Sequence, residues 1–188
     1  MPQLGEEHWL NPPPAFTQKD GVLAVITGHE TDYWNNTFYG FKHDNGHFLA
    51  TPVTGDFSLT VTFSAGYSAL YDQAGAMLRV DADNWLKCGV EFTDGRKNFS
   101  VVVTRDDQSD WSVMPVGGEL AEQVTLRLTR HDEALRVEIE QEGTFRLVRL
   151  AYLKMPEMVV AGPMCGSPVG ERLHASFQRV EFGGPIRR

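Results

Sequence analysis

The 188-residue sequence predicts an all-β fold, in which two antiparallel sheets pack face to face as a jelly-roll sandwich. About ten segments show the alternation of apolar and polar residues that is typical of half-buried strands. Short, turn-rich gaps separate these segments, and no window of about 11 residues keeps a helical period. Hydrophobic residues make up 41% of the chain, which is enough to form the core of such a sandwich.

We expect a single domain over residues 1–188, because the chain shows neither an internal repeat nor a linker. Residues 1–20 are expected to form an extended lead-in to this domain. The run 11–14 holds three prolines, which exclude a helix interior and a central strand. Trp9 and Leu10 precede the prolines and favour burial, so we expect the lead-in to be ordered.

The clearest strand covers residues 56–63, where four apolar residues alternate with serine and threonine. Apolar patterns bounded by turn residues predict nine further strands, over residues 22–26, 73–81, 85–93, 98–105, 124–130, 134–141, 145–150, 158–164 and 173–182.

Asp94-Gly95 predicts a tight hairpin turn between the strands 85–93 and 98–105. Closing the hairpin there gives three apolar pairs on the core face, Val90–Phe99, Cys88–Val101 and Leu86–Val103. The opposite face then pairs Glu91 with Asn98 and Lys87 with Val102. A shift of one residue would place polar groups in the core, so the register is well determined.

A turn at residues 82–84 predicts a second hairpin, in which Arg79 lies opposite Lys87 and Met77 opposite Gly89. Two cations in opposed positions destabilise a sheet, so we expect a negative group between them. That group is Glu91, an acidic residue from a neighbouring strand, or a bound anion. Gly75 and Gly89 on this face would leave room for a ligand to approach the backbone.

The charge balance restricts the class of partner. Acidic residues number 25 against 17 lysines and arginines, a net charge of −8, which disfavours a nucleic-acid partner. We expect no membrane partner, because no apolar run has the length of a membrane-spanning helix. The first ten residues lack the basic start and apolar run of a secretory signal, and two cysteines suit a reducing compartment. We therefore expect a cytoplasmic protein.

A set of short motifs extends from about residue 8 to residue 183: Trp9-Leu-Asn-Pro-Pro13, Thr31-Asp-Tyr-Trp34, Tyr39-Gly-Phe41, Tyr71-Asp-Gln-Ala-Gly75, Trp85-Leu-Lys87, Val90-Glu-Phe-Thr-Asp-Gly95, Ser109-Asp-Trp-Ser112 and Gly162-Pro-Met164. In this combination the chain resembles the regulator-of-enolase family, a group of domains of unknown function in the concanavalin A-like lectin and glucanase superfamily. The resemblance implies the same two-sheet sandwich. The fungal relatives are linked to control of a glycolytic enzyme, which implies an interaction role.

The middle motifs, over residues 73–95, also resemble accessory sandwich domains attached to xylan- and arabinan-degrading enzymes. Lectin-like jelly rolls usually bind sugars on the concave sheet. By this analogy, the face that carries Arg79, Lys87 and Glu91 is the concave surface.

The leading hypothesis is a non-catalytic domain that binds a carbohydrate, or an acidic or phosphorylated sugar. Arg79 and Lys87 would hold the anionic or hydroxyl-rich part of the ligand. The hydroxyls would bind Gln73, Glu91 and Asn98. The candidates for stacking on a sugar ring are Tyr71 and Trp111, and Trp34 and Tyr39 are further aromatic candidates. Asp72 is included because it follows Tyr71 in the sequence, and His47 because we expect it at the rim of a cleft.

Three alternatives stay open. The polar face is an ordinary solvated sheet surface, or it docks a protein partner, together with the loop 34–47, in a regulatory interaction module of carbohydrate metabolism. The third is a carbohydrate-active enzyme with an atypical pair of acids. The strand 85–93 carries Glu91 as its single acid, so a second would have to come from Asp72, Asp110 or Glu119.

We expect no metal ion and no cofactor. His43 and His47 are four residues apart across an Asn-Gly turn, which is typical of a polar loop and not of a helical metal site. The segment 81–84 has the composition of a hairpin turn. Cys88 is predicted to lie in the core, and Cys165 in a loop near a strand end.

Overall fold

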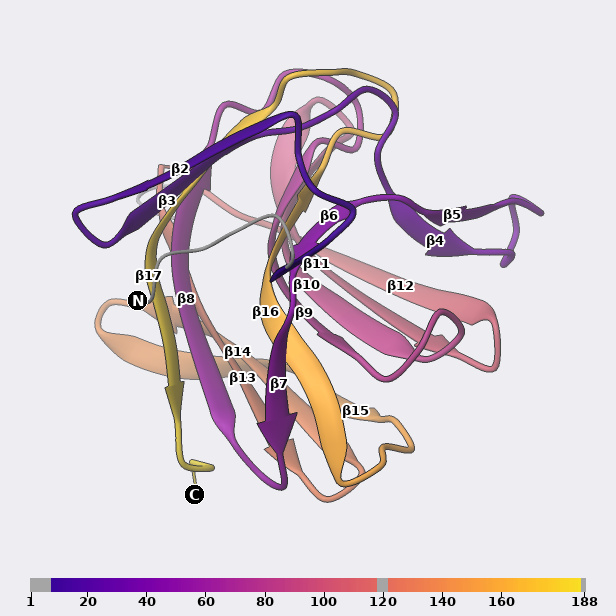
Figure 1. The fold of residues 1–188 in the computed structure, drawn as a ribbon, viewed down its shortest axis with the longest axis vertical. Coiled ribbons are helices and arrows are strands. Elements are labelled where there is room, and N and C mark those ends of the chain that lie inside the picture. Colours follow the sequence, from indigo (N-terminus) through magenta and orange to yellow (C-terminus); the bar gives the residue numbers. More distant parts are fainter. Residues whose placement is uncertain (1–7, 118–121, 187–188) are drawn as a thin grey trace.

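The computed structural model describes residues 8–117 and 122–186, which form a sandwich of two antiparallel sheets (Figure 1). Within these residues, sheet A has eight strands in the order β1-β6-β16-β9-β10-β11-β12, with β7 also paired to β16. Sheet B has seven, in the order β15-β14-β13-β8-β17-β3-β2, and β4 and β5 form a separate two-stranded ribbon. The predicted two-sheet, all-β class is confirmed.

Sheet A consists of β1 (Trp9–Leu10), β6 (His47–Leu49), β7 (Thr51–Thr54), β9 (Gln73–Arg79), β10 (Trp85–Thr93), β11 (Arg96–Arg105), β12 (Gln108–Pro115) and β16 (Met158–Gly166). Sheet B consists of β2 (Ala15–Lys19), β3 (Val22–Ile26), β8 (Ser58–Ala65), β13 (Val124–His131), β14 (Ala134–Gln141), β15 (Thr144–Tyr152) and β17 (His174–Gly183). The ribbon consists of β4 (Tyr33–Asn35) and β5 (Lys42–Asp44).

Each of the ten predicted strands is present. The strands that the sequence pattern did not indicate are β1, β2, β4, β5, β6, β7 and β12. Most of these have two to five residues, too few to show a clear alternation. The described part of the predicted lead-in contains β1 and β2, and residues 1–7 lie outside the described residues. None of the described residues belongs to a helix long and apolar enough to span a bilayer.

The core lies between the two sheets and is built from alternate strand positions. Leu59, Val61 and Phe63 of β8 are buried in it, as are Cys88 and Val90 of β10. This is the assignment of faces that the period-two pattern predicted for both strands.

Two local predictions were wrong. Cys165 lies within β16 and is fully buried, not in a loop. Burial raises the pKa of both thiols, Cys88 and Cys165, to about 12, so neither is an activated nucleophile. His43 and His47 belong to β5 and β6, and only Asn45-Gly46 remains as a turn between these strands.

The predicted register of the β10–β11 hairpin is confirmed pair by pair, including Val90 with Phe99 and Glu91 with Asn98. The predicted register of β9 against β10 was wrong by two residues, because Arg79 pairs with Trp85 and not with Lys87. A shift of two leaves every side chain on its predicted face. The opposed cations therefore do not exist as a cross-strand pair.

The cause of the shift is the side chain of Asp81. Its carboxylate accepts hydrogen bonds from the Asp83 backbone N–H at 2.8 Å and from Asn84 Nδ2 at 3.0 Å. This bonding stabilises a loop from Val80 to Asn84, which is longer than the expected turn at 82–84.

In the observed register, Gly75 pairs directly with Gly89. A Cβ atom on Gly89 would overlap the carbonyl oxygen of Ala74 and lie 2.7 Å from the Gly75 Cα. Gly75 is confined in the same way, by the carbonyl oxygen of Cys88 and the Cα of Gly89 at 2.6 Å. The close approach of β9 and β10 itself requires both glycines.

The face of sheet A that points away from the core, called the outer face below, carries a second apolar cluster. The ribbon β4–β5 stands beside this sheet near β12 (Figure 1) and contributes to the cluster. Its buried members are Tyr33, Trp34, Phe48, Met77, Trp85, Val102 and Met164. The outer face is therefore covered, and it is not the solvated surface considered among the alternatives.

We predict that Gly89→Ala lowers the free energy of unfolding by about 1–3 kcal/mol or more, because the new methyl group must displace backbone. Urea denaturation measures the loss. Gly66→Ala is the matched control, since a Cβ atom there meets nothing within 4 Å. Its effect should stay within about 0.5 kcal/mol. Similar losses in both variants would contradict the close strand approach.

Candidate functional site

A pocket of about 280 Å³ opens on the outer face of sheet A, beside the ribbon β4–β5. It is lined by Asp32, Trp34, Tyr39, Phe41, His43, Tyr71, Gln73, Lys87, Glu91, Val102, Trp111, Pro168 and Val169. The floor comes from β9 to β12, one wall from the ribbon, and the remaining wall from the loops before β9 and after β16.

Cross-strand pairing assembles the floor. Gln73 of β9 pairs with Glu91 of β10, which places both side chains on one face. Lys87 of β10 pairs with Val102 of β11, and Val102 pairs in turn with Trp111 of β12. The alternation of strand side chains thus brings five residues from four strands to one site.

The walls are four aromatic rings in consecutive edge-to-face contact. The ring centroids of Tyr39 and Trp34 are 5.5 Å apart at an interplanar angle of 72°. Trp34 and Trp111 are 6.4 Å apart at 84°, and Trp111 and Tyr71 are 6.4 Å apart at 76°. Neighbouring rings are therefore nearly perpendicular to each other, in the edge-to-face arrangement that aromatic pairs prefer.

Lys87 is buried at the floor and uses all three of its N–H donors within the protein. Its Nζ donates to Asp32 Oδ1 at 3.0 Å, to the Tyr33 carbonyl at 2.6 Å and to Gln73 Oε1 at 2.7 Å. A buried ammonium is tolerated only when it is paired and hydrogen-bonded in this way.

Asp32 is the ion-pair partner of Lys87, and its Oδ1 atom accepts several hydrogen bonds from the fold. Besides Lys87, this atom accepts from Gln73 Nε2 at 2.9 Å and from the Tyr33 backbone N–H at 2.7 Å. Within residues 8–117 and 122–186, no donor reaches the second oxygen, Oδ2. Asp32 lines the pocket, so this oxygen is available to a ligand.

Glu91 is the second carboxylate of the pocket and is 6% exposed. Ser100 Oγ donates to its Oε2 at 3.0 Å, and Trp111 Nε1 donates to Ser100 Oγ at 3.0 Å. Burial raises the pKa of Glu91; Lys87 and Ser100 oppose the rise, while Asp32 adds to it. The chain of bonds fixes the Trp111 ring relative to the carboxylate.

Arg79 lies outside the pocket and forms a bidentate ion pair with Asp44 of β5. The distances are 2.5 Å from NH1 to Oδ1 and 2.9 Å from NH2 to Oδ2. Each cation of the outer face thus has its own acid, Asp44 for Arg79 and Asp32 for Lys87. The expectation of one negative group between the two cations was therefore wrong, because each cation pairs with a different acid from outside sheet A.

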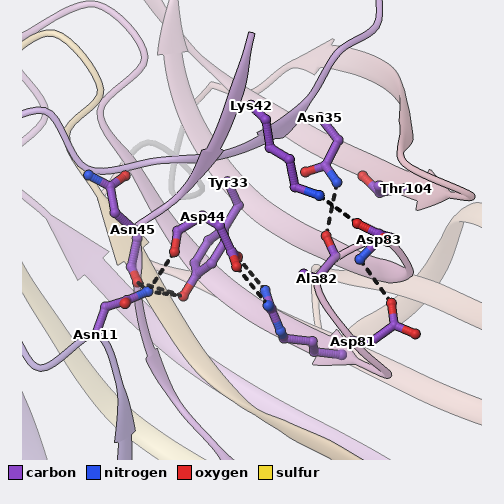
Figure 2. Close-up of polar contacts among 12 residues, drawn as sticks. Asn11, Tyr33, Asn35, Lys42, Asp44, Asn45, Asp81, Ala82, Asp83 and Thr104 are labelled. Carbon is purple, nitrogen blue, oxygen red and sulfur yellow. Dashed lines mark hydrogen bonds and ion pairs between the residues drawn. The ribbon is translucent and has the colours of Figure 1, made fainter.

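The Arg79–Asp44 pair belongs to a network that ties the ribbon to the sandwich (Figure 2). Asn11 Nδ2 donates to the Tyr33 hydroxyl at 3.3 Å and to the Asp44 carbonyl at 2.9 Å. At the other end of the ribbon, Lys42 Nζ donates to Asp83 at 2.5 Å. These contacts hold the aromatic wall in place over the sheet.

The structure brings five of the nine predicted site residues together in the pocket: Tyr71, Gln73, Lys87, Glu91 and Trp111. Arg79, Asp72, Asn98 and His47 do not line it.

Asp72, Asn98 and His47 bond to the fold itself. The Asp72 carboxylate accepts from the hydroxyl of Ser167 at 2.6 Å. Asn98 Nδ2 donates to the Thr93 carbonyl at 3.0 Å. His47 Nδ1 donates to the Asn11 carbonyl at 2.8 Å and Nε2 accepts from the Gly28 N–H at 2.9 Å. Burial lowers the pKa of His47.

The main omission of the sequence prediction is Asp32, because the second acid beside Glu91 was sought at Asp72, Asp110 or Glu119. Asp110 lies on the surface and pairs with Arg149 at 3.0 Å, and Glu119 is outside the described residues. Asp32 precedes Tyr33-Trp34 in one of the motifs, but nothing local links it to a strand more than fifty residues away. His43, Phe41, Pro168 and Val169 were also missed.

In the described part of the chain, no cluster of His, Cys, Asp and Glu is suited to hold a metal ion.

Comparisons with known proteins agree with the fold. A sequence family described as "Protein of unknown function (DUF1349)" matches residues 9–185. The chain is 37% identical over 185 residues to "Regulation of enolase protein 1" of Saccharomyces cerevisiae, covering 98% of this chain and 92% of the relative. The crystal structure of a functionally unknown protein from Saccharomyces cerevisiae superposes with a TM-score of 0.90, at 37% identity over 95% of this chain and 96% of the other.

More distant structures share the fold alone. A xylan β-1,4-xylosidase from Bacillus halodurans matches with a TM-score of 0.72 and 16% identity, over 97% of this chain and 38% of that enzyme. The predicted resemblance to the regulator-of-enolase family and to the sandwich domains of xylan-degrading enzymes is thus confirmed at the level of family and fold.

We predict that Lys87→Met lowers the free energy of unfolding by about 3–5 kcal/mol, because it leaves Asp32 and Gln73 buried without their donor. Denaturant titration measures the change. Lys42→Met is the control: Lys42 also bridges acids but is partly exposed, so its loss should be clearly smaller. Equal losses in the two variants would contradict a central role for Lys87.

A second prediction concerns pH. Because the folded pKa of Glu91 is raised, its contribution to stability is full below the unfolded pKa, about 4.3, and is lost as pH rises through the folded pKa. Glu91→Gln removes this dependence. The variant should therefore gain stability relative to the parent as pH rises from about 4.3. Unfolding free energies across this range measure the difference, and a constant difference would refute the expected titration.

Proposed function

Since the chain belongs to the DUF1349 family, whose description assigns no activity, the site must supply the function, and we propose that this protein is a non-catalytic domain that binds a small carbohydrate in the aromatic pocket. The observation that carries the proposal is the composition of the pocket. Aromatic rings line it, and Gln73, Lys87 and Glu91 form its polar floor beside the Asp32 carboxylate.

This combination suits a sugar because a pyranose ring has apolar faces and polar edges. Either Trp111 or Tyr71 can stack on an apolar face. Asp32 Oδ2 and Glu91 can accept hydrogen bonds from hydroxyls, which are donors that carboxylates bind well. The volume of about 280 Å³ lies at the small end of ligand sites, so we expect a ligand of one or two sugar rings.

The remote structural relatives give weaker support. Several are enzymes whose names refer to xylan or xyloglucan, and a sandwich of this fold forms about a third of each. The likeness suggests that the fold is compatible with carbohydrate recognition, and it transfers no residue roles.

We favour binding over hydrolysis for two reasons. Strand β10 carries Glu91 as its single acid, without the alternating acids of a jelly-roll glucanase. The other acid of the pocket, Asp32, has one oxygen held by three donors of the fold, which is the arrangement of a structural and binding group.

A second candidate is regulation through a protein partner. The Saccharomyces cerevisiae relative is named for regulation of enolase, and aromatic side chains are exposed at the pocket mouth. Phe38 is 94% exposed and Phe41 42% exposed at the end of the ribbon, and Val169 is 56% exposed on the opposite loop. A partner could cover these residues, with or without a sugar in the pocket.

We predict that the protein binds mono- or disaccharides and that Trp111→Ala weakens binding by about tenfold or more, because it removes the ring that contacts both Trp34 and Tyr71. A thermal-shift screen finds the ligand, since saturation at about 100 times Kd adds about 2.7 kcal/mol. Calorimetric titration then gives the affinities.

Tyr152→Ala provides the control, because Tyr152 is an aromatic residue 54% exposed on β15, in the other sheet. Its affinity for the sugar should equal that of the parent. If no sugar binds the parent protein, the carbohydrate proposal fails and the protein-partner candidate takes its place.

A further inference from the structure

We propose that the pocket selects a sugar that carries an ammonium group, an amino sugar, over neutral and phosphorylated sugars. This inference rests on the carbohydrate-binding function proposed above and names the substrate class of the same site. Three features of the pocket carry it: its balance of charge, its free acceptor atoms and the arrangement of its rings.

The charge balance of the pocket is negative. The ionisable side chains that line it are Asp32, Glu91, Lys87, His43, Tyr39 and Tyr71. Lys87 and Asp32 form an ion pair and cancel each other. The ionised form of Glu91 then leaves one uncompensated negative charge in a site of low polarity, where a ligand cation would be strongly attracted.

The pocket offers carboxylate oxygens as acceptors for a ligand. Asp32 Oδ2 has no donor from the described residues, and Glu91 receives a hydrogen bond from Ser100 at Oε2. An ammonium group brings three N–H donors to one point, whereas a hydroxyl brings one. Glu91 is buried, and this burial raises its pKa because it destabilises the charged carboxylate. A cation placed beside a buried carboxylate stabilises it more than a cation beside an exposed one does.

The rings add a second attraction for positive charge. Tyr39, Trp34, Trp111 and Tyr71 stand at 72°, 84° and 76° to one another in sequence. All four rings line the pocket, and an aromatic face that meets a ligand cation there attracts it through the ring quadrupole. A neutral sugar would use one ring for stacking and gain little from the others.

The same features disfavour a phosphorylated or acidic sugar. An anion would be held best by the N–H donors of a cation, but the three of Lys87 are already bound to Asp32, Tyr33 and Gln73. Both terminal nitrogens of the Arg79 guanidinium donate to Asp44, and Arg79 does not line the pocket. An anionic group beside Glu91 would meet repulsion without compensation.

The test is a calorimetric comparison of three matched pairs: glucosamine with glucose, galactosamine with galactose and mannosamine with mannose. At about pH 6.5 the amines are protonated. We expect at least one amino sugar to bind about tenfold or more tightly than its neutral partner, as a charge-assisted contact implies. Glucose 6-phosphate should bind more weakly than glucose.

Glu91→Gln tests the source of the preference, because it keeps the shape of the side chain and removes its charge. The affinity ratio of the amino sugar to its neutral partner should fall several-fold in this variant. Glu181→Gln is the control, since Glu181 lies on β17 of the opposite sheet and pairs with Arg179. It should leave the ratio unchanged.

The outcomes separate the two proposals. Equal affinity for amino and neutral sugars, or a preference for glucose 6-phosphate, overturns the charge selectivity and leaves carbohydrate binding standing. An affinity ratio that does not change in Glu91→Gln overturns the assignment of the preference to this site. Absence of binding by every sugar overturns the proposed function, and this inference with it.

Discussion

The buried ion pair between Lys87 and Asp32 is the interaction on which the rest of the site depends. Lys87 projects from the middle of sheet A, and its three acceptors come from the neighbouring strand and from the segment that starts the ribbon β4–β5. A buried ammonium left without these acceptors would be strongly destabilising. The ribbon must therefore pack on the outer face, where Tyr33 and Trp34 join a second apolar cluster.

The pocket is a consequence of this covering. The ribbon covers part of the outer face, and the pocket beside it is lined by Trp34, Tyr71, Trp111 and Glu91. Paired glycines allow β9 and β10 to approach closely, and the observed register sets Gln73 opposite Glu91. The polar floor and the aromatic walls thus come from one requirement, the neutralisation of charges that the sheet buries.

The comparisons place this arrangement within a shared sandwich. At 15–16% identity, the xylan-related enzymes share the two-sheet framework. The same framework can host different chemistry, because function resides in the residues that a particular chain adds to it. In this chain the site is built from the ribbon, the acids Asp32 and Asp44, and the aromatic rings beside Trp34.

The sequence by itself determined ten of the strands, the faces of their side chains and the register of β10 with β11, because alternation and an Asp-Gly turn are local signals. It also indicated Tyr71, Gln73, Lys87, Glu91 and Trp111 as site residues. Only the tertiary structure decided the register of β9, which depends on the hydrogen bonds of Asp81. The acids that neutralise Arg79 and Lys87 were likewise decided by tertiary structure, since charge pairing across distant segments leaves no local pattern in the chain.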